Sequence, residues 1–271
     1  MLPVPRQLPL YVVDAFTDQV FRGNPAAVCI LDSPRDAHWM QSVAAEMNLS
    51  ETAFLVRSTG AMQLRWFTPT IEVDLCGHAT LATAHILFET GLIPGEKHVV
   101  FETASGKLTC FKRDSWIEMD FPAERPVPAD HSADLLVALK ADGAIVSLMR
   151  NRLDYLVEIA DARSLRRLKP DMGLLAKLPV RGIIVTARSN DPDFDFVSRF
   201  FAPAAGINED PVTGSAHCCL GPYWGEILRK KELIGFQASR RGGIVRVSLC
   251  PDRVILAGQA VTVLRAHLAA G

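Results

Sequence analysis

The chain has 271 residues, of which 49% are hydrophobic and 22% are charged, and its formal net charge is -1. This composition is typical of a globular protein, and the near-zero charge offers no broad basic surface for nucleic acid. No stretch reaches the roughly 18 uncharged apolar residues of a spanning helix, and the first residues show no secretory leader, so we expect no membrane partner. The six cysteines lack paired C-x-x-C spacing, which disfavours a structural zinc and favours a cytoplasmic protein.

Short apolar runs and two helical patterns fill the first half of the chain. We expect strands at residues 9–16, 25–31, 53–56, 61–68 and 115–121. Residues 34–47 repeat apolar side chains at helical spacing, and the Ser33-Pro34 pair before them suits a helix start. Residues 79–88 are apolar on nearly every face, and Gly91 can end that helix. A helix of this kind must be enclosed, and a strongly curved sheet is the simplest enclosure.

The second half repeats this content. We expect strands at residues 145–149, 153–159, 182–186, 194–201, 244–249 and 253–257. Helices are predicted at residues 132–140 and 216–228, the second with a kink or an irregular first turn at Gly221-Pro222. Residues 122–130 contain three prolines and are the natural linker between the halves.

One pattern of a strand, a turn and a helix start occurs twice. Arg65-Trp66-Phe67-Thr68-Pro69 leads to Asp74-Leu75-Cys76-Gly77-His78-Ala79, and Arg199-Phe200-Phe201-Ala202-Pro203 leads to Thr213-Gly214-Ser215-Ala216. The offset from Gly77 to Gly214 is 137 residues (214 minus 77), about half of the chain. We infer two related halves, and two helix N-termini brought together would make one site for an anionic small molecule.

Three side chains of the first half are candidates for chemistry. Glu51 falls between the end of a helix and an apolar strand, where partial desolvation would suit a carboxylate that takes and returns a proton, although a solvated turn also accounts for it. His78 follows Gly77, which lets a ligand approach the backbone, so it is either catalytic or structural. Cys76 is either a thiol activated by the helix N-terminus or a small buried hydrophobe.

The turn of the second half is rich in polar groups. Asp210 precedes Pro211, which biases it into the turn, and Thr213 and Ser215 supply hydroxyls around Gly214. This arrangement suits a cradle for a carboxylate or an oxyanion, or else an ordinary helix cap. The repetition of the turn favours the cradle. Asn24 lies in a third polar turn before a strand.

Five segments together resemble the PhzF-like family of phenazine-biosynthesis isomerases, which is related to diaminopimelate epimerase. They occur in family order at residues 23–28, 47–54, 65–69, 76–80 and 209–216. The resemblance implies an α/β (α+β) fold of two pseudo-symmetric lobes, each a curved β-sheet or barrel around a central helix, with the active site between them. We accordingly expect an N-terminal lobe of residues 1–121 and 258–271 and a C-terminal lobe of residues 122–257. It also implies a biosynthetic enzyme that needs no metal or organic cofactor and forms a homodimer.

The resemblance also assigns residues. The family's catalytic positions fall on Glu51, His78 and Asp210. Its substrate-binding positions fall on Asn24, Ser50, Gly77, Thr213, Gly214 and Ser215. The related epimerases use two thiols, one at each helix start, whereas this chain has Cys76 at the first and Thr213 at the second. That departure disfavours a two-thiol racemase.

We therefore expect an isomerase that moves a proton within a small carboxylate-bearing metabolite, with Glu51 as general acid and base. Two alternatives stay open on the sequence. One is a thiol-assisted epimerase or racemase that uses Cys76. The other is a metabolite-binding protein that lacks turnover.

Overall fold

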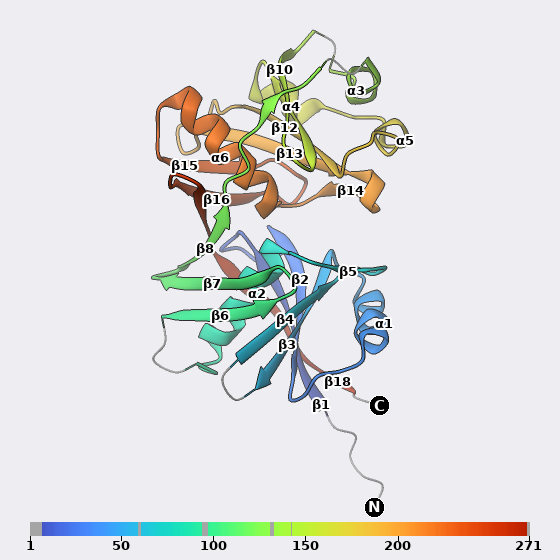
Figure 1. Ribbon diagram of the computed structural model, residues 1–271, viewed down its shortest axis with the longest axis vertical. Coiled ribbons are helices and arrows are strands. Elements are labelled where there is room, and N and C mark those ends of the chain that lie inside the picture. Colours follow the sequence, from blue (N-terminus) through green and yellow to red (C-terminus); the bar gives the residue numbers. More distant parts are fainter. Residues whose placement is uncertain (1–6, 59–60, 94–96, 131–132, 142, 270–271) are drawn as a thin grey trace, which may run out of the picture. The chain divides into compact units, whose positions relative to one another are not determined.

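The computed structural model describes residues 7–58, 61–93, 97–130, 133–141 and 143–269 (Figure 1). The chain forms two compact units. Unit 1 consists of Met1–Asp120 and Ala257–Gly271, and unit 2 consists of Phe121–Leu256. Each unit is a mixed α/β structure that combines a sheet with helices. No helix within the described ranges is long and apolar enough to cross a membrane.

The sheet of unit 1 mixes antiparallel and parallel pairs. Its strands are β1 (Gln7–Ala15), β2 (Asn24–Leu31), β3 (Glu51–Ser58), β4 (Ala61–Phe67), β5 (Glu72–Val73), β6 (His98–Thr103), β7 (Gly106–Arg113), β8 (Trp116–Pro122) and β18 (Ala260–Ala269). β1 pairs antiparallel with β2 and with β18, β2 pairs parallel with β3, and β3 pairs antiparallel with β4. β4 then pairs antiparallel with β5 and parallel with β6, which continues antiparallel into β7 and β8.

Two helices cover the strands of unit 1. α1 (Ala37–Met47) packs Met40, Val43 and Ala44 into a core formed with alternate residues of β1, β2 and β3. α2 (Gly77–Glu89) is buried on nearly all faces and packs against β1, β2, β3, β7 and β18. Since β2 is buried along almost its whole length, it reads as a continuous apolar run rather than an alternating one. The expected enclosure of an apolar helix by strands is confirmed.

The first turn of α1 differs from the expectation. The helix begins at Ala37 rather than at residue 34, and Asp36 is its cap. The Asp36 carboxylate accepts hydrogen bonds from the N–H groups of His38 and Trp39, which satisfies two donors that a helix leaves free. A carboxylate cap is as favourable as serine, so the Ser33-Pro34 pair lies outside the helix.

Unit 2 repeats the order of unit 1. Its strands are β9 (Val127–Pro128), β10 (Ile145–Arg150), β11 (Asp154–Ile159), β12 (Gly182–Arg188), β13 (Phe196–Ala202), β14 (Ile207–Asp210), β15 (Glu232–Gln237), β16 (Gly243–Leu249) and β17 (Arg253–Gly258). β10 and β11 pair antiparallel, β11 and β12 parallel, and β12 and β13 antiparallel. β13 pairs antiparallel with β14 and parallel with β15, and β15 pairs antiparallel with β16. The same succession of pairings runs from β1 to β7 in unit 1.

The helices of unit 2 lie on both faces of β12. They are α3 (Ala133–Leu139), α4 (Ala162–Arg167), α5 (Met172–Leu175) and α6 (Gly214–Leu228). Ile183 and Val185 of β12 join the core under α3, α4 and α5. Thr186 lies between Val185 and Ala187 and faces the other side of the strand. Its hydroxyl accepts a hydrogen bond of 2.9 Å from the indole N–H of Trp224 on α6. The predicted helix at residues 132–140 is found as α3, while residue 132 lies outside the described residues.

Pro222 is accommodated within α6 without ending it. Because proline has no N–H, the carbonyl of Cys218 loses its helical partner. That carbonyl instead accepts a hydrogen bond of 3.0 Å from the N–H of Glu124, in the segment that was expected to be a linker. This segment also contains β9, which pairs with β10, so residues 122–130 are more ordered than their prolines suggest.

Candidate active site

The polar cluster of unit 1 forms where β2, β3 and α2 begin. We define this cluster as Asn24, Glu51, Cys76 and His78. Asn24 is the first residue of β2 and Glu51 the first of β3, and these two strands run parallel with Ala26 opposite Glu51. Cys76 is the N-cap of α2, and Gly77 and His78 are its first two residues. Strands that begin side by side therefore bring residues far apart in sequence to one place.

His78 connects the members of the unit 1 cluster. Its Nε2 atom lies 3.1 Å from Oε2 of Glu51. Its Nδ1 atom lies 3.3 Å from Nδ2 of Asn24 and 3.5 Å from the Cys76 sulfur. The side chains of His78 and Glu51 are only 7% and 13% exposed, so their interaction is weakly screened by water. Oε2 of Glu51 and Nε2 of His78 face each other without the alignment of a hydrogen bond.

The charges of the unit 1 cluster act on one another. Burial opposes protonation of His78, but Cys76 and Glu51 outweigh it and hold the pKa of His78 well above its usual value. Burial, followed by the charge of Glu51, raises the pKa of the Cys76 thiol. With its proton retained, the Cys76 thiol acts on His78 as a hydrogen-bond partner, and the Glu51 carboxylate is the charge that favours the imidazolium of His78.

The same three side chains are a possible donor set for a metal. Glu51, Cys76 and His78 each offer a ligand atom within 4.8 Å of the other two. A carboxylate, a thiolate and an imidazole are ligands that zinc accepts. However, the sulfur approaches Nδ1 of His78 while the carboxylate approaches Nε2, on opposite sides of the ring. An ion bound by all three would require a side chain to turn, whereas proton transfer along the ring requires no movement.

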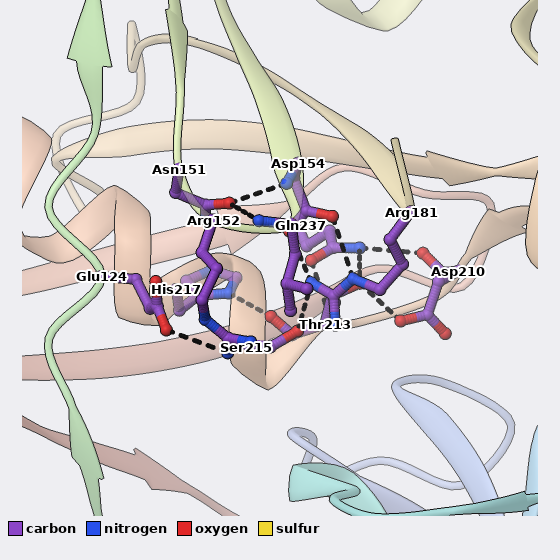
Figure 2. A network of polar contacts seen from close by, with 11 residues as sticks. Glu124, Asn151, Arg152, Asp154, Arg181, Asp210, Thr213, Ser215, His217 and Gln237 are labelled. Atoms are coloured by element: carbon purple, nitrogen blue, oxygen red, sulfur yellow. Dashed lines mark hydrogen bonds and ion pairs between the residues drawn. The ribbon is translucent and has the colours of Figure 1, made fainter. Parts of the chain in front are cut away.

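The polar cluster of unit 2 surrounds the start of α6. We define this cluster as Asp154, Arg181, Asp210, Thr213, Ser215 and Gln237, all drawn in Figure 2. The Thr213 hydroxyl donates a short hydrogen bond to Oδ2 of Asp210. The Gln237 amide fixes the turn, since Oε1 accepts from the N–H of Thr213 at 2.9 Å and Nε2 donates to the carbonyl of Asp210 at 2.8 Å. Asp210 and Thr213 are thus held at one end of the helix.

Arg181 enters the same cluster from the start of β12. Its Nε and Nη2 atoms donate to both carboxylate oxygens of Asp154, with 2.9 Å between Nε and Oδ1. Nη2 also lies 3.0 Å from the hydroxyl oxygen of Ser215, to which it donates. Figure 2 shows the guanidinium between Asp154 and the helix start. Asp154 is fully buried and Arg181 is 36% exposed, so the carboxylate anchors a cation that reaches toward solvent.

The first N–H groups of α2 and α6 have no side-chain cap. Neither Cys76 nor Thr213 makes a capping hydrogen bond, and only the weakly accepting Cys76 sulfur faces the N–H of Ala79. By contrast, α1, α4 and α5 are each capped by an aspartate. Uncapped N–H groups and the helix dipole both favour a bound anion. The two helix starts that the sequence repeat identifies are therefore suited to a carboxylate.

The strand registers identify equivalent positions in the two units. Thr52 lies opposite Phe67 in unit 1, and Ile183 lies opposite Phe201 in unit 2. Phe67 and Phe201 occupy the same place in the repeated Arg-aromatic-Phe segment. Counting back one residue makes Gly182 the equivalent of Glu51, and counting back two makes Arg181 the equivalent of Ser50.

The residues expected from the sequence thus fall into two groups. Within unit 1, Asn24, Glu51, Gly77 and His78 lie together, and Ser50 directly precedes Glu51. In unit 2, Asp210, Thr213, Gly214 and Ser215 lie together at the start of α6. The sequence reasoning missed Asp154, Arg181 and Gln237. A signal for Arg181 existed, because Arg181-Gly182 precedes an apolar strand as Ser50-Glu51 does.

A surface hollow elsewhere in unit 2 contains none of these residues. It has a volume of about 370 Å³ and lies at the turn between β12 and β13. Of its two cationic residues, Arg188 and Lys230, the second is already paired with Asp195 at 2.5 Å. The polar clusters are therefore the better candidates for chemistry.

Comparison with known proteins identifies a family. A phenazine biosynthesis-like (PhzC-PhzF) family model matches residues 13–266. An uncharacterized isomerase from Halalkalibacterium halodurans is 56% identical over 96% of this chain and 98% of its own length. The crystal structure of a PhzF family protein from Enterococcus faecalis has a TM-score of 0.92 at 40% identity, covering 97% of this chain and 99% of that one. A hydroxyproline epimerase from Agrobacterium vitis shares the fold alone, with a TM-score of 0.64 at 14% identity over 97% of this chain and 93% of that one.

The fold and the relatives define an isomerase with an epimerase-like α/β fold. More narrowly, the chain belongs to the phenazine biosynthesis-like family of PhzF proteins. The resemblance stated from the sequence is confirmed, and so is the expected fold class.

Proposed function

We propose that this protein moves a proton between two carbons of a small carboxylate-bearing metabolite, with Glu51 as both general base and general acid and with no cofactor. The observation that supports this most directly is the state of Glu51. Its Oε2 atom is buried beside His78, yet no aligned hydrogen bond within the described residues occupies it. A buried carboxylate oxygen that the protein leaves without an aligned hydrogen bond is suited to accept a proton from carbon.

The proposed reaction needs one proton and one electron pair. Glu51 takes a proton from an activated carbon, and the electron pair of the broken C–H bond moves into the adjacent unsaturated system of the substrate. The protonated Glu51 then returns that proton to a second carbon, whose new C–H bond uses an electron pair of the same system. His78, as an imidazolium, orients the substrate and stabilises the negative charge that develops.

Unit 2 supplies the proposed binding groups for the substrate's carboxylate. The N–H groups at Gly214 and the hydroxyl of Ser215 are suited to this role, as is the N–H at Gly77 in unit 1. Asp210 orients the substrate or relays a proton, and Thr213 fixes its carboxylate. Asn24 and Ser50 are proposed as further contacts beside Glu51.

The comparison of equivalent positions favours a single base. Gly182 occupies the position of Glu51, and Thr213 occupies the position of Cys76. Unit 2 thus lacks both a carboxylate and a thiol where unit 1 has them. A racemase that works from two opposed faces needs two such groups, whereas transfer by one carboxylate needs one.

The thiol-assisted epimerase remains the alternative that the contacts allow. The Cys76 sulfur lies 3.5 Å from Nδ1 of His78, which can accept the thiol proton only when the imidazole is neutral. Against it, burial and Glu51 raise the pKa of Cys76, so the reactive thiolate is disfavoured.

One assay separates these functions. A pool of cellular metabolites is incubated with the protein in deuterated water, and each compound is examined for a gain in mass. We expect exchange with wild type and with Cys76→Ser, and loss of exchange with Glu51→Gln. Loss in Cys76→Ser, with deuterium at one stereocentre, would favour the epimerase. A ligand that raises Tm while no compound gains deuterium would favour a binding protein.

The family resemblance also supports a homodimer in the cytoplasm. Sedimentation of the purified chain tests the first part of this proposal. A monomer across the accessible concentration range would contradict it.

A further inference from the structure

One nitrogen of the Arg181 guanidinium, Nη1, makes no hydrogen bond within the described structure. Its Nε and Nη2 atoms are committed to Asp154 and Ser215, while Nη1 has no partner among the described residues. An arginine carries five N–H donors in a fixed plane, so the two donors of Nη1 remain available. Because the side chain is 36% exposed, a ligand can reach them.

Arg181 is held in place from three sides. Its backbone N–H donates to the carbonyl of Leu153 at 2.9 Å. The buried Asp154 fixes the guanidinium through a bidentate pair, and the N–H groups of Leu153 and Asp154 are in turn bound to Asn151. The guanidinium carbon also lies 5.5 Å from the centre of the Phe200 ring. A cation oriented in advance loses little conformational entropy when it binds an anion.

The position of Arg181 adds an independent argument. The equivalent residue of unit 1 is the neutral Ser50, and the residue after it is the proposed base Glu51. Unit 2 has instead a cation followed by a glycine. Arg181 is the one cation in the unit 2 cluster, and it contacts Ser215 directly.

We propose that Arg181 is the residue that selects an anionic substrate, by binding a substrate carboxylate with Nη1 beside the Ser215 hydroxyl. This inference rests on the proposed function and narrows its substrate class to metabolites with a carboxylate that reaches Arg181. A carboxylate suits this position, because one of its oxygens can accept from Nη1 while the other accepts from the hydroxyl of Ser215, whose oxygen is already held by Nη2.

Binding of malonate, measured by isothermal titration calorimetry, tests this role without turnover. Wild type is expected to bind malonate in the millimolar range and not to bind the neutral malonamide. Arg181→Gln is expected to weaken malonate binding at least about tenfold, since hydrogen bonds to a charged donor are roughly twice as strong as neutral ones. Arg181→Lys is expected to restore part of the affinity. Arg113→Gln removes an exposed arginine from an ion pair with Glu118 and is the matched control, with unchanged affinity.

A second variant guards against misfolding, because Arg181→Gln alone leaves the Asp154 carboxylate buried without its partner. Arg181→Gln combined with Asp154→Asn replaces the ion pair by two neutral amides, so no buried carboxylate is left without a partner. We expect this double variant to fold and to bind malonate as weakly as Arg181→Gln. Wild-type affinity in the double variant, or no malonate binding by wild type, would overturn the proposal. The proposed function is tested separately, by deuterium exchange with wild type. A failure of the Arg181 proposal can therefore be distinguished from a failure of the proposed function.

Discussion

Units 1 and 2 share a succession of strand pairings and a buried helix, and they differ at the positions where chemistry is expected. Both carry a bidentate ion pair on the repeated strand, between Arg65 and Glu72 in unit 1 and between Arg199 and Glu209 in unit 2. Arg199 further donates to the carbonyls of Leu165 and Leu168 at the end of α4. These pairs fix the strand before each turn. The repeated sequence signal is therefore mainly a signal of structure.

The differences between the units suit them to different steps, proton transfer in unit 1 and anion binding in unit 2. Unit 1 places Glu51 where β3 begins, and unit 2 places Gly182 where β12 begins. A Cβ atom at Gly182 would lie 2.3 Å from the Phe200 ring, so the space that a side chain would need is already filled. A position that carries a proposed base in one unit is closed in the other. This favours proton transfer by unit 1 and anion binding by unit 2.

The buried histidines of the two central helices show the same division. Burial lowers the pKa of His217 on α6 to about 4, and a hydrogen bond to the Thr213 carbonyl only partly opposes this. His78 on α2 is also buried, but Cys76 and Glu51 raise its pKa. The neighbouring charges, rather than burial, decide which histidine is charged at neutral pH.

The largest expected effect concerns the one-base arrangement. Glu51→Gln keeps the size of the side chain but cannot take a proton from carbon, so we expect solvent deuterium exchange to fall by about 10²–10⁴-fold. Mass spectrometry of the exchanged metabolite measures this. Glu118→Gln, in an exposed ion pair, is the control and should exchange normally. If Glu51→Gln exchanges at the wild-type rate, the proposed base is wrong.

The two histidines should give stability opposite dependences on pH. Because the pKa of His217 is lowered to about 4, its contribution is present above the unfolded value of about 6.5 and is lost as the pH falls toward 4. The loss amounts to about 3 kcal/mol over that range. For His78, whose folded pKa is raised, the contribution is present below about 6.5 and is lost as the pH rises through the folded value.

Urea unfolding near pH 7 and near pH 4 measures the effect of His217. His217→Gln should lose less stability over this interval than wild type. The exposed His267→Gln is the control and should behave as wild type. Equal losses in wild type and His217→Gln would show that His217 is not the acid-sensitive group.

Gly182→Ala tests whether the second base position is closed. The added methyl group must displace the Phe200 ring, so we expect a loss of about 1–3 kcal/mol in the free energy of unfolding. Gly173→Ala is the matched control, since its Cβ meets only Oδ1 of Asp171 at 3.4 Å. Urea unfolding that leaves both variants equally stable would show that the ring moves aside freely.

Ser215→Ala should have the smallest effect. It removes one hydroxyl but leaves the N–H groups and dipole of α6, so we expect malonate affinity to fall about two- to fivefold. Calorimetry with wild type and the variant measures the ratio. Affinity that disappears altogether would mean that the hydroxyl, rather than the helix start, binds the anion.

The sequence indicated the fold through its repeated segments and apolar runs. Strands with clear β-branched or alternating residues were predicted, and the apolar residues of α2 correctly indicated an enclosed helix. Elements with mixed or exposed residues were missed. They are β5, β6, β7, β9, β14, β15, β18, α4 and α5. β18 illustrates the reason, because pairing with β1, rather than burial of its own side chains, sustains it.

The candidate site was predictable only where a motif carries it. Glu51, His78 and Asp210 lie in short segments that the family resemblance marks. Arg181 and Gln237 lie outside those segments, and their roles depend on contacts across 34 residues to Ser215 and 24 residues to Thr213. The spacing of residues along the chain does not predict such contacts. Only the pairing of β12 with β13 reveals which residue replaces Ser50.

The pairing of β1 with β18 has a consequence for synthesis on the ribosome. β18 pairs with β1 from Gln7 opposite Ala269 to Ala15 opposite Ala260, so unit 1 needs both ends of the described chain. Unit 2 is continuous from Phe121 to Leu256 and can fold as soon as it has emerged. The proposed base is therefore made early, but the sheet that contains it is completed only after β18 has emerged. Until β18 has been translated, the edge of β1 that pairs with it has no strand partner.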